Sequence, residues 1–138
     1  GERTKTGREH RVPLTPRLKK ILSEAKNLSL HAELIFASPT TGLSLSYNTL
    51  LHVLQKRIGS EATVHGFRSS FKDWAAETTN FSNEVSEMAL SHNISNPVEA
   101  AYRRGDLLEK RRELMNAWEN FVCNPGQNIV TVDFKAQG

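Results

Sequence analysis

The sequence predicts a mostly α-helical domain of the α+β class, with a small antiparallel β-hairpin or sheet at one edge. Several segments carry apolar residues at helical spacing, whereas alternating or continuous apolar runs are short and few. A chain of 138 residues with 38% hydrophobic residues is long enough for one buried core. A mean hydropathy of -0.48 argues against a membrane protein, and no uninterrupted apolar run approaches the ~18 residues needed to span a bilayer.

The first elements are expected at the N-terminal edge. Residues 2–6 and 9–14 flank a turn-like centre at residues 6–8, which predicts a β-hairpin whose second strand ends at Pro13. Thr15 and Pro16 predict a helix start, because threonine caps helices and proline fits the first helical position. The apolar face of this helix consists of Leu18, Ile21, Leu22 and Ala25. A short buried strand is expected at residues 34–37, followed by a turn at residues 38–42.

The remainder is predicted to be mainly helical. Ser46 is the expected cap of a helix that reaches about Arg57 and stops at Gly59. Thr63 is the expected cap of a helix over about residues 64–78, with an apolar stripe of Phe67, Phe71, Trp74 and Ala75. Further helices are expected over residues 82–90, from residue 96, and over about 107–122 with Leu107, Leu108, Leu114, Ala117, Trp118 and Phe121 inward. Residues 129–134 are typical of a strand, and Trp74 and Trp118 are expected core anchors.

The charge distribution makes a polyanion a plausible partner, although a solvated surface explains it equally well. The net charge is only +3, but basic residues concentrate in residues 1–20 and in a second cluster of Arg103, Arg104, Lys110, Arg111 and Arg112. The single cysteine, Cys123, fits a reducing cytosol and excludes a zinc site built on two cysteines. His10, His31 and His52 have no partner at metal-ligand spacing, so no metal or other cofactor is expected.

Four polar residues stand out by their spacing. His65 and Arg68 lie three residues apart on one face of a predicted helix, near the end where backbone N–H groups are free. His92 follows Arg68 after 24 residues, and Tyr102 follows His92 after ten. Each residue alone is typical of ordinary surface or core, and only the combination is specific.

In combination these residues resemble the C-terminal signature of the tyrosine recombinases, the phage integrase family. The segment from Lys5 to Thr15 is similar to the β-hairpin that carries a catalytic lysine in that family. The run His65-Gly66-Phe67-Arg68-Ser69-Ser70-Phe71 and the long helix through Trp118 resemble integrases of prophages and genomic islands. The resemblance covers about residues 2–122.

The resemblance implies a helical DNA breaking and rejoining domain that acts through a 3′-phosphotyrosyl intermediate. It implies that Tyr102 is the nucleophile, that Arg68 and His92 bind the scissile phosphate, that His65 is the base, and that Lys5 is the general acid. Arg8, Arg11, Arg103 and Arg104 are expected to contact DNA. The implied partners are double-stranded DNA at attachment sites and further copies of the chain, in a tetramer on DNA. The implied location is the bacterial cytoplasm, in association with the nucleoid.

The resemblance also indicates an N-terminally truncated catalytic domain at residues 1–122 and a tail at residues 123–138. The first of the family's two pocket arginines precedes the hairpin, so the isolated fragment is expected to be inactive. The tail strand is expected to dock either on its own chain or on a neighbouring subunit. Two alternatives stay open: a non-catalytic DNA-binding or assembly module, and an enzyme similar to type IB topoisomerases.

Overall fold

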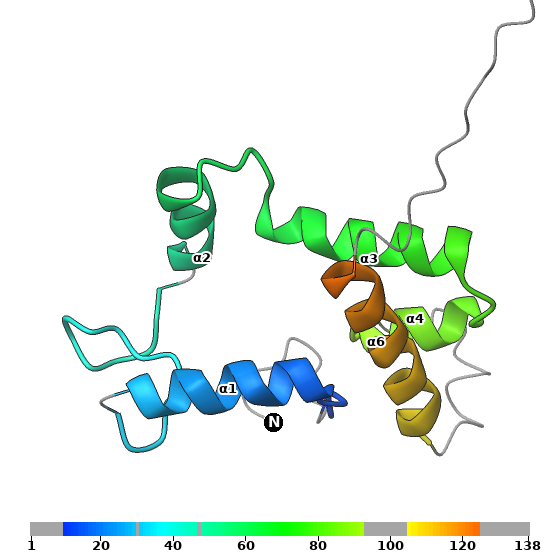
Figure 1. Ribbon diagram of the computed structural model, residues 1–138, viewed down its shortest axis with the longest axis horizontal. Helices are drawn as coiled ribbons and strands as arrows, with labels where there is room; N and C mark the ends of the chain where they lie inside the picture. The colour runs from blue at the N-terminus through cyan, green and yellow to red at the C-terminus, as the bar shows by residue number, and fades with distance from the viewer. Residues whose placement is uncertain (1–9, 30, 47, 93–104, 125–138) are drawn as a thin grey trace, which may run out of the picture.

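The computed structural model describes residues 10–29, 31–46, 48–92 and 105–124, and these residues are mostly helical. The helices are α1 (Pro16–Leu28), α2 (Thr49–His52), the π-helical turn η1 (Val53–Arg57), α3 (Val64–Thr78), α4 (Asn83–Ala89) and α6 (Leu108–Cys123). Figure 1 shows α3, α4 and α6 gathered on one side, with α1 beneath and α2 at the opposite end. No helix among the residues described is both long and apolar enough to cross a bilayer.

The core forms where α3, α4 and α6 meet. Its buried residues are Phe71, Trp74, Ala75, Val85 and Leu114. Trp118 packs on this cluster, with its ring centroid 5.0 Å from that of Trp74 and 5.4 Å from that of Phe71. The expected roles of both tryptophans are therefore confirmed. Phe67, the first residue of the expected apolar stripe, is 54% exposed, because α4 and α6 pack against the later turns of α3.

The predicted helix starts are confirmed at two positions. The Thr15 hydroxyl accepts a hydrogen bond from the backbone N–H of Leu18 at 3.3 Å. It also donates to the carboxylate of Glu119 on α6, which accepts from the Arg17 N–H at 3.0 Å. The Thr63 hydroxyl caps α3 in the same way, accepting from the Gly66 N–H at 3.0 Å. A carboxylate from α6 thus joins the cap of α1 and fixes the start of that helix to the core.

The β-structure expected at the N-terminal edge is not confirmed. Residues 10–14 form no strand, and residues 2–9 lie outside the described part of the chain. The strand expected at residues 34–37 is wrong, since only one isolated antiparallel bridge joins Ala37 to Ser44. The turn between them is present, with Gly42 at φ 68° and its N–H donating to the Ser38 carbonyl. A two-stranded ribbon gains little from pairing when no third strand lies beside it, and the described residues supply none, which explains why the ladder does not extend there.

The helix expected from Ser46 to Arg57 begins later and changes form. The residue before its first turn is Asn48, and the Ser46 hydroxyl instead lies 3.0 Å from that of Thr49. From Val53 onward the backbone widens into the π-helical turn, in which the Ile58 N–H donates to the Val53 carbonyl at 3.1 Å. Gly59, at φ 72°, follows this turn, so the expected stop is confirmed.

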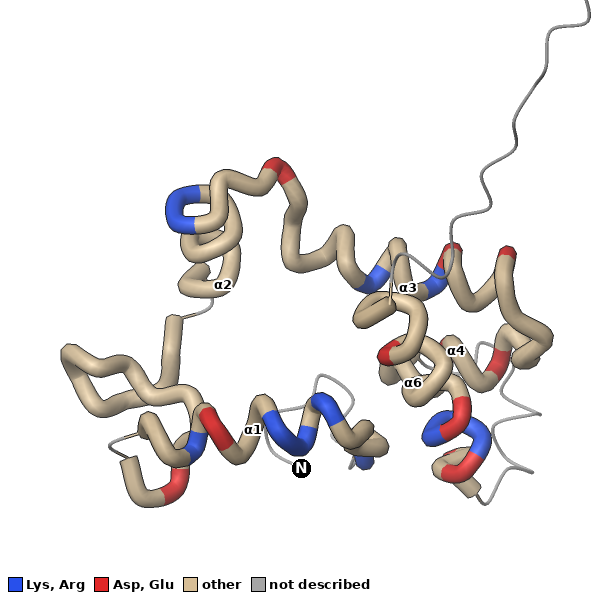
Figure 2. The backbone as a smooth tube through the Cα atoms, in the orientation of Figure 1, with Lys and Arg blue, Asp and Glu red and all other residues tan. Residues whose placement is uncertain are grey.

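The second basic cluster, of which Lys110, Arg111 and Arg112 lie on α6, is partly structural. Arg111 is 1% exposed, and its guanidinium donates to the backbone carbonyls of Arg11 and Asp106. Arg112 pairs with Glu109 at 3.1 Å. Figure 2 shows basic residues along α1 and a mixture of both charges on α6. Arg111 therefore fastens the segment before α1 to α6 and is not available to a polyanion.

Candidate functional site

The first turn of α3 presents His65 and Arg68 at the surface. Thr63 caps this turn, and a Cβ added to Gly66 would lie 3.2 Å from the Thr63 hydroxyl oxygen. Glycine at this position therefore lets the cap approach the backbone without crowding. Both His65 and Arg68 are exposed, as expected for residues three apart near the N-terminus of a helix.

The guanidinium of Arg68 reaches across to the end of α4. Its Nη2 donates to the Leu90 carbonyl at 2.6 Å and to Nε2 of His92 at 2.9 Å. Two residues separated by 24 positions in the sequence are thus in direct contact. Nη1 and Nε of Arg68 have no acceptor among the residues described, so N–H groups on these two nitrogens remain for an anionic ligand, whereas both N–H groups of Nη2 are engaged.

The end of α4 sets the position of His92. The His92 N–H donates to the Glu87 carbonyl at 3.0 Å, and the Ser91 N–H donates to the Met88 carbonyl at 3.2 Å. These two bonds define a Schellman motif, in which the residue after the helix adopts the left-handed conformation that glycine usually occupies. Here that residue is Ser91, at φ 57°. The motif folds the chain back so that His92 lies beside the last turn of its own helix.

Glu87 links His92 to a lysine on α3. Its Oε2 lies 2.5 Å from Nδ1 of His92, and its Oε1 lies 2.6 Å from Nζ of Lys72. Nζ of Lys72 also donates to the Ser86 hydroxyl at 2.8 Å and to the side-chain oxygen of Asn83. The hydrogen bond from Lys72 lowers the pKa of the Glu87 carboxyl, as does the bond to His92, while burial opposes both. The result is a continuous chain of polar contacts from Arg68 through His92 and Glu87 to Lys72.

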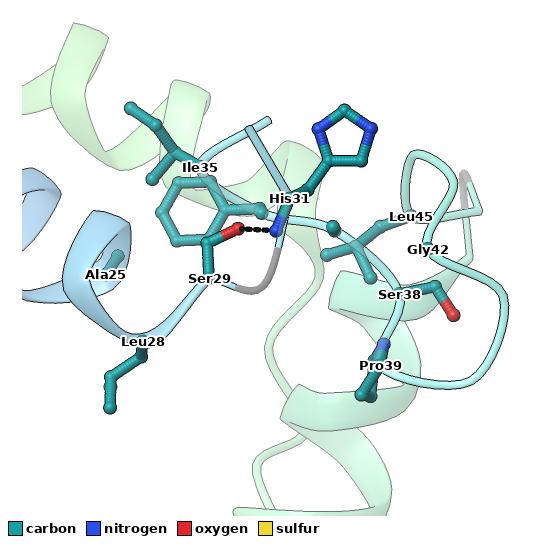
Figure 3. Close-up of a pocket in the computed structure, with 11 residues that line it drawn as sticks. Ala25, Leu28, Ser29, His31, Ile35, Ser38, Pro39, Gly42 and Leu45 are labelled. Atoms are coloured by element: carbon teal, nitrogen blue, oxygen red, sulfur yellow. Dashed lines mark hydrogen bonds between the residues drawn. The ribbon is translucent and has the colours of Figure 1, made fainter. Parts of the chain in front are cut away.

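His65 lies beside this chain of contacts without joining it. His65 and Arg68 line one cavity of about 730 Å³ together with apolar side chains that include Phe36, Leu45 and Leu50. A second cavity of about 500 Å³ shares Phe36 and Leu45 with the first. Figure 3 shows this second cavity, where the Ser29 hydroxyl accepts from the His31 N–H at 3.2 Å. None of the sequence-predicted site residues lines the second cavity.

Arg11 lies outside this group and is held by an acidic residue. Its Nε and Nη2 donate to Oδ2 of Asp106 at 3.0 and 2.8 Å. The neighbouring His10 hydrogen-bonds to the Ala89 backbone, and burial, together with the charge of Arg111, lowers the pKa of its imidazole. The segment before α1 therefore runs past the end of α4, close to the Arg68–His92 contact. Lys5, Arg8, Tyr102, Arg103 and Arg104 lie outside the described residues.

The sequence analysis did not single out Glu87, Lys72 or His10. A glutamate five residues before a histidine, across a helix end, is a weak signal, because only the Schellman motif brings the two side chains together. Lys72 and Glu87 lie on different helices, so no local spacing relates them. Within the described part of the chain, no group of three or more histidine, cysteine or acidic residues has the arrangement of a metal site.

The arrangement can bind an anionic oxygen. The N–H groups on Nε and Nη1 of Arg68 are the donors that remain among the described contacts, and the imidazole beside them can offer a further donor when it is protonated. Phosphate and carboxylate are the groups that such an arrangement suits best, because both present several oxygens to a fork of N–H donors.

Comparison with known proteins finds similarity to integrases. The chain is 35% identical over 133 residues to the prophage integrase IntA of Escherichia coli K12. The matched region covers 94% of this chain and 32% of IntA. The chain is 29% identical over 119 residues to the integrase of enterobacteria phage P4, covering 83% of this chain and 27% of that protein. The prophage integrase IntZ of E. coli K12 is 28% identical over 120 residues, covering 86% of this chain. No protein-family model and no solved structure matches the chain.

These similarities, which extend over most of this chain, support its assignment to the phage integrase family. It matches a segment of about a third of the length of the integrases to which it is similar.

Proposed function

We propose that this chain is part of the catalytic domain of a site-specific DNA recombinase that cleaves and rejoins DNA through a 3′-phosphotyrosyl intermediate. In this proposal residues 1–122 belong to the catalytic domain and residues 123–138 form a tail. The full-length protein acts on double-stranded attachment sites as a tetramer, and integrates or excises a prophage or genomic island. The relatives that are named integrases support the general activity.

The observation that carries the proposal is the contact between Arg68 and His92. It brings a permanent cation on α3 and an imidazole beyond the end of α4 together at 2.9 Å, and Nε and Nη1 of the guanidinium have no acceptor within the described part of the chain. A phosphodiester is anionic, and attack on phosphorus increases the charge on its non-bridging oxygens. Fixed donors directed at such oxygens lower the barrier because they need little reorganisation during the reaction. Arg68 and His92 are therefore assigned to the non-bridging oxygens of the scissile phosphate.

The remaining roles follow from the chemistry of the other residues. Tyr102 is proposed as the nucleophile, and a phenol with a pKa of about 10 needs a nearby base or cation to react at neutral pH. His65, which lines the same cavity as Arg68, is proposed as that base. Lys5 is proposed as the acid that protonates the departing 5′-oxygen. The phosphotyrosyl bond conserves the phosphodiester linkage, so rejoining needs no ATP.

The DNA-binding role of the basic residues is also proposed. Arg8, Arg103 and Arg104 are assigned to backbone phosphates, which attract arginine regardless of sequence. Arg11 would contact DNA only by sharing its guanidinium with Asp106 or by leaving it. Its role in DNA binding is therefore the weakest of the four.

The direct test is covalent trapping by the full-length gene product that contains this sequence. A nicked duplex with the protein's own attachment site loses the short fragment after cleavage, so the covalent adduct accumulates and survives denaturing electrophoresis. We expect an adduct with the unaltered protein and none with Tyr102→Phe. The chain has two tyrosines, so Tyr47→Phe is the matched control and should form the adduct normally.

A second variant tests the phosphate site itself. Arg68→Ala removes a donor from the developing charge, and we expect adduct formation to slow by about 100-fold or more. An unaltered protein that binds the duplex but forms no adduct would be a non-catalytic binding module. That result would overturn the proposed activity.

A further inference from the structure

We propose that Glu87 is a positioning residue of this site, which holds the His92 imidazole so that its Nε2 faces the guanidinium of Arg68. The proposal rests on the function proposed above for its consequence in catalysis, but its structural part can be tested separately. Glu87 has no place among the site residues expected from the sequence. Its assignment comes from its contacts with His92 on one side and Lys72 on the other.

The hydrogen-bonding capacity of the partners fixes the tautomer of His92. A guanidinium carries only donors, so Nε2 of His92 must accept the 2.9 Å hydrogen bond from Arg68. A neutral imidazole with an accepting Nε2 carries its proton on Nδ1. Nδ1 therefore donates to Oε2 of Glu87 at 2.5 Å. Each contact requires the same protonation state, so the two are mutually consistent.

Lys72 keeps Glu87 suited to this role. The ammonium lies 2.6 Å from Oε1, and it is itself held by Ser86 and Asn83. Its hydrogen bond lowers the pKa of the Glu87 carboxyl, so the group stays ionised and accepts hydrogen bonds only. With one oxygen bound to Lys72, the other is directed at His92. The carboxylate is thus fixed in place from α3 while it orients a residue beyond the end of α4.

The consequence concerns how the site receives a phosphate. With Nδ1 anchored, Nε2 is the only ring nitrogen that can face the ligand. It accepts from Arg68 when the site is empty. In the imidazolium form Nε2 no longer accepts from Arg68, so Nε2 and the released N–H of Nη2 can both donate to phosphate oxygens while the Glu87 carboxylate remains bound to Nδ1. At metal sites, loss of a carboxylate that fixes the tautomer and orientation of a functional histidine typically lowers affinity or activity by about 10- to 100-fold. We use the same range for the expected effect here.

The test is nitrogen-15 NMR of the His92 ring in this chain, which reports the protonated nitrogen directly. We expect the unaltered chain near neutral pH to have Nδ1 protonated and Nε2 unprotonated. Glu87→Ala removes the acceptor of Nδ1 and leaves only the Arg68 contact to favour the Nδ1-protonated form, so we expect the fraction of Nε2-protonated ring to rise. Glu87→Gln retains an oxygen acceptor without the charge, so it should largely keep the Nδ1-protonated form.

Glu77→Ala is the matched control, because it removes an exposed glutamate from the last turn of α3. It should leave the His92 signals unchanged, and circular dichroism should show equal helix content in all variants. A His92 tautomer that is the same in Glu87→Ala as in the unaltered chain would overturn the proposal. So would an equal shift in Glu77→Ala.

The catalytic consequence has its own readout. In the trapping assay, Glu87→Ala should slow adduct formation by roughly 10-fold or more, with a smaller loss in Glu87→Gln. If the unaltered protein forms no adduct while the tautomer shifts as expected, the proposed function fails and the positioning role stands. If the adduct forms at the same rate in both Glu87 variants as in the unaltered protein, the positioning role in catalysis is wrong.

Discussion

The two carboxylate oxygens of Glu87 contact two different nitrogen donors, and we expect the stability of the fold to decrease in acid for this reason. Lys72 contacts Oε1, and His92 contacts Oε2. Neither contact is a regular backbone interaction, so neither could be read from local patterns in the sequence. His65, Arg68 and His92 were found by their spacing, whereas the residues that hold His92 and Arg68 in place were not.

The lowered pKa of Glu87 predicts the direction of the pH dependence. A carboxyl with a lower pKa in the folded state stabilises the fold above its unfolded value of about 4.5, and this contribution disappears as the pH falls through the folded value. The free energy of unfolding should therefore decrease below about pH 4.5. Lys72→Met, which removes the main cause of the lowered pKa, should reduce this decrease.

Urea denaturation at a series of pH values measures this dependence. The control is Lys110→Met, which removes an exposed lysine from α6. The explanation is wrong if Lys72→Met and Lys110→Met have the same pH profile as the unaltered chain.

At the scale of the elements, the helices with strong local signals were predicted well. Thr15-Pro16 and Thr63 mark the starts of α1 and α3 as expected, because capping is a local interaction. The strand at residues 34–37 and the uninterrupted helix from Ser46 were wrong. A strand depends on a partner that local pattern does not supply, and the widening into η1 has no marker such as proline or glycine before Gly59.

Ser91 provides a test of the Schellman motif that positions His92. A residue other than glycine in the left-handed region costs roughly 1–2 kcal/mol, and the cost is greater for a β-branched side chain. Ser91→Gly should keep the motif, with stability equal to or above that of the unaltered chain. Ser91→Val should lower the free energy of unfolding by about 1–2 kcal/mol and slow adduct formation, because the chain after α4 can no longer fold back easily.

Thermal denaturation and the trapping assay measure these two effects. Ser69→Val, on the exposed surface of α3, is a control for the general effect of a β-branched residue. Equal stability and activity of the Ser91→Gly and Ser91→Val variants would contradict the role of the motif.

At the scale of the whole molecule, the sequence predicted the helical class and a single core. It did not predict which helices form that core. The core is built on α3, α4 and α6, whereas α1 has no buried residue in the described structure. Leu18, Ile21, Leu22 and Ala25 form the expected apolar face of α1, yet Ile21 is 43% exposed. Periodicity identified this face correctly as apolar, but it could not tell what covers it.

The net charge and the basic residues of α1 predict how the chain binds DNA. Arg17, Lys19 and Lys20 are exposed on α1, and Figure 2 shows that basic residues occur along this helix. We expect weak binding to duplex DNA whose affinity falls steeply as salt rises, because phosphate contacts release condensed counterions. Replacing both Lys19 and Lys20 with glutamine should lower the slope of log affinity against log salt by up to about 2.

Fluorescence anisotropy with a labelled duplex measures this slope. Replacing Glu24 with glutamine removes a charge of opposite sign on the same helix and should not lower the slope. Binding that does not change between low and physiological salt would contradict the assignment of the basic residues to phosphates.

The most direct test of the central claim is to map the covalent attachment by mass spectrometry. The trapped adduct of the full-length protein is digested with nuclease and protease, and the peptide that retains a nucleotide is sequenced. We predict the nucleotide on Tyr102, with the yield reduced by about 100-fold or more in Arg68→Ala. A nucleotide on Tyr47 or on any residue other than Tyr102 would contradict the account.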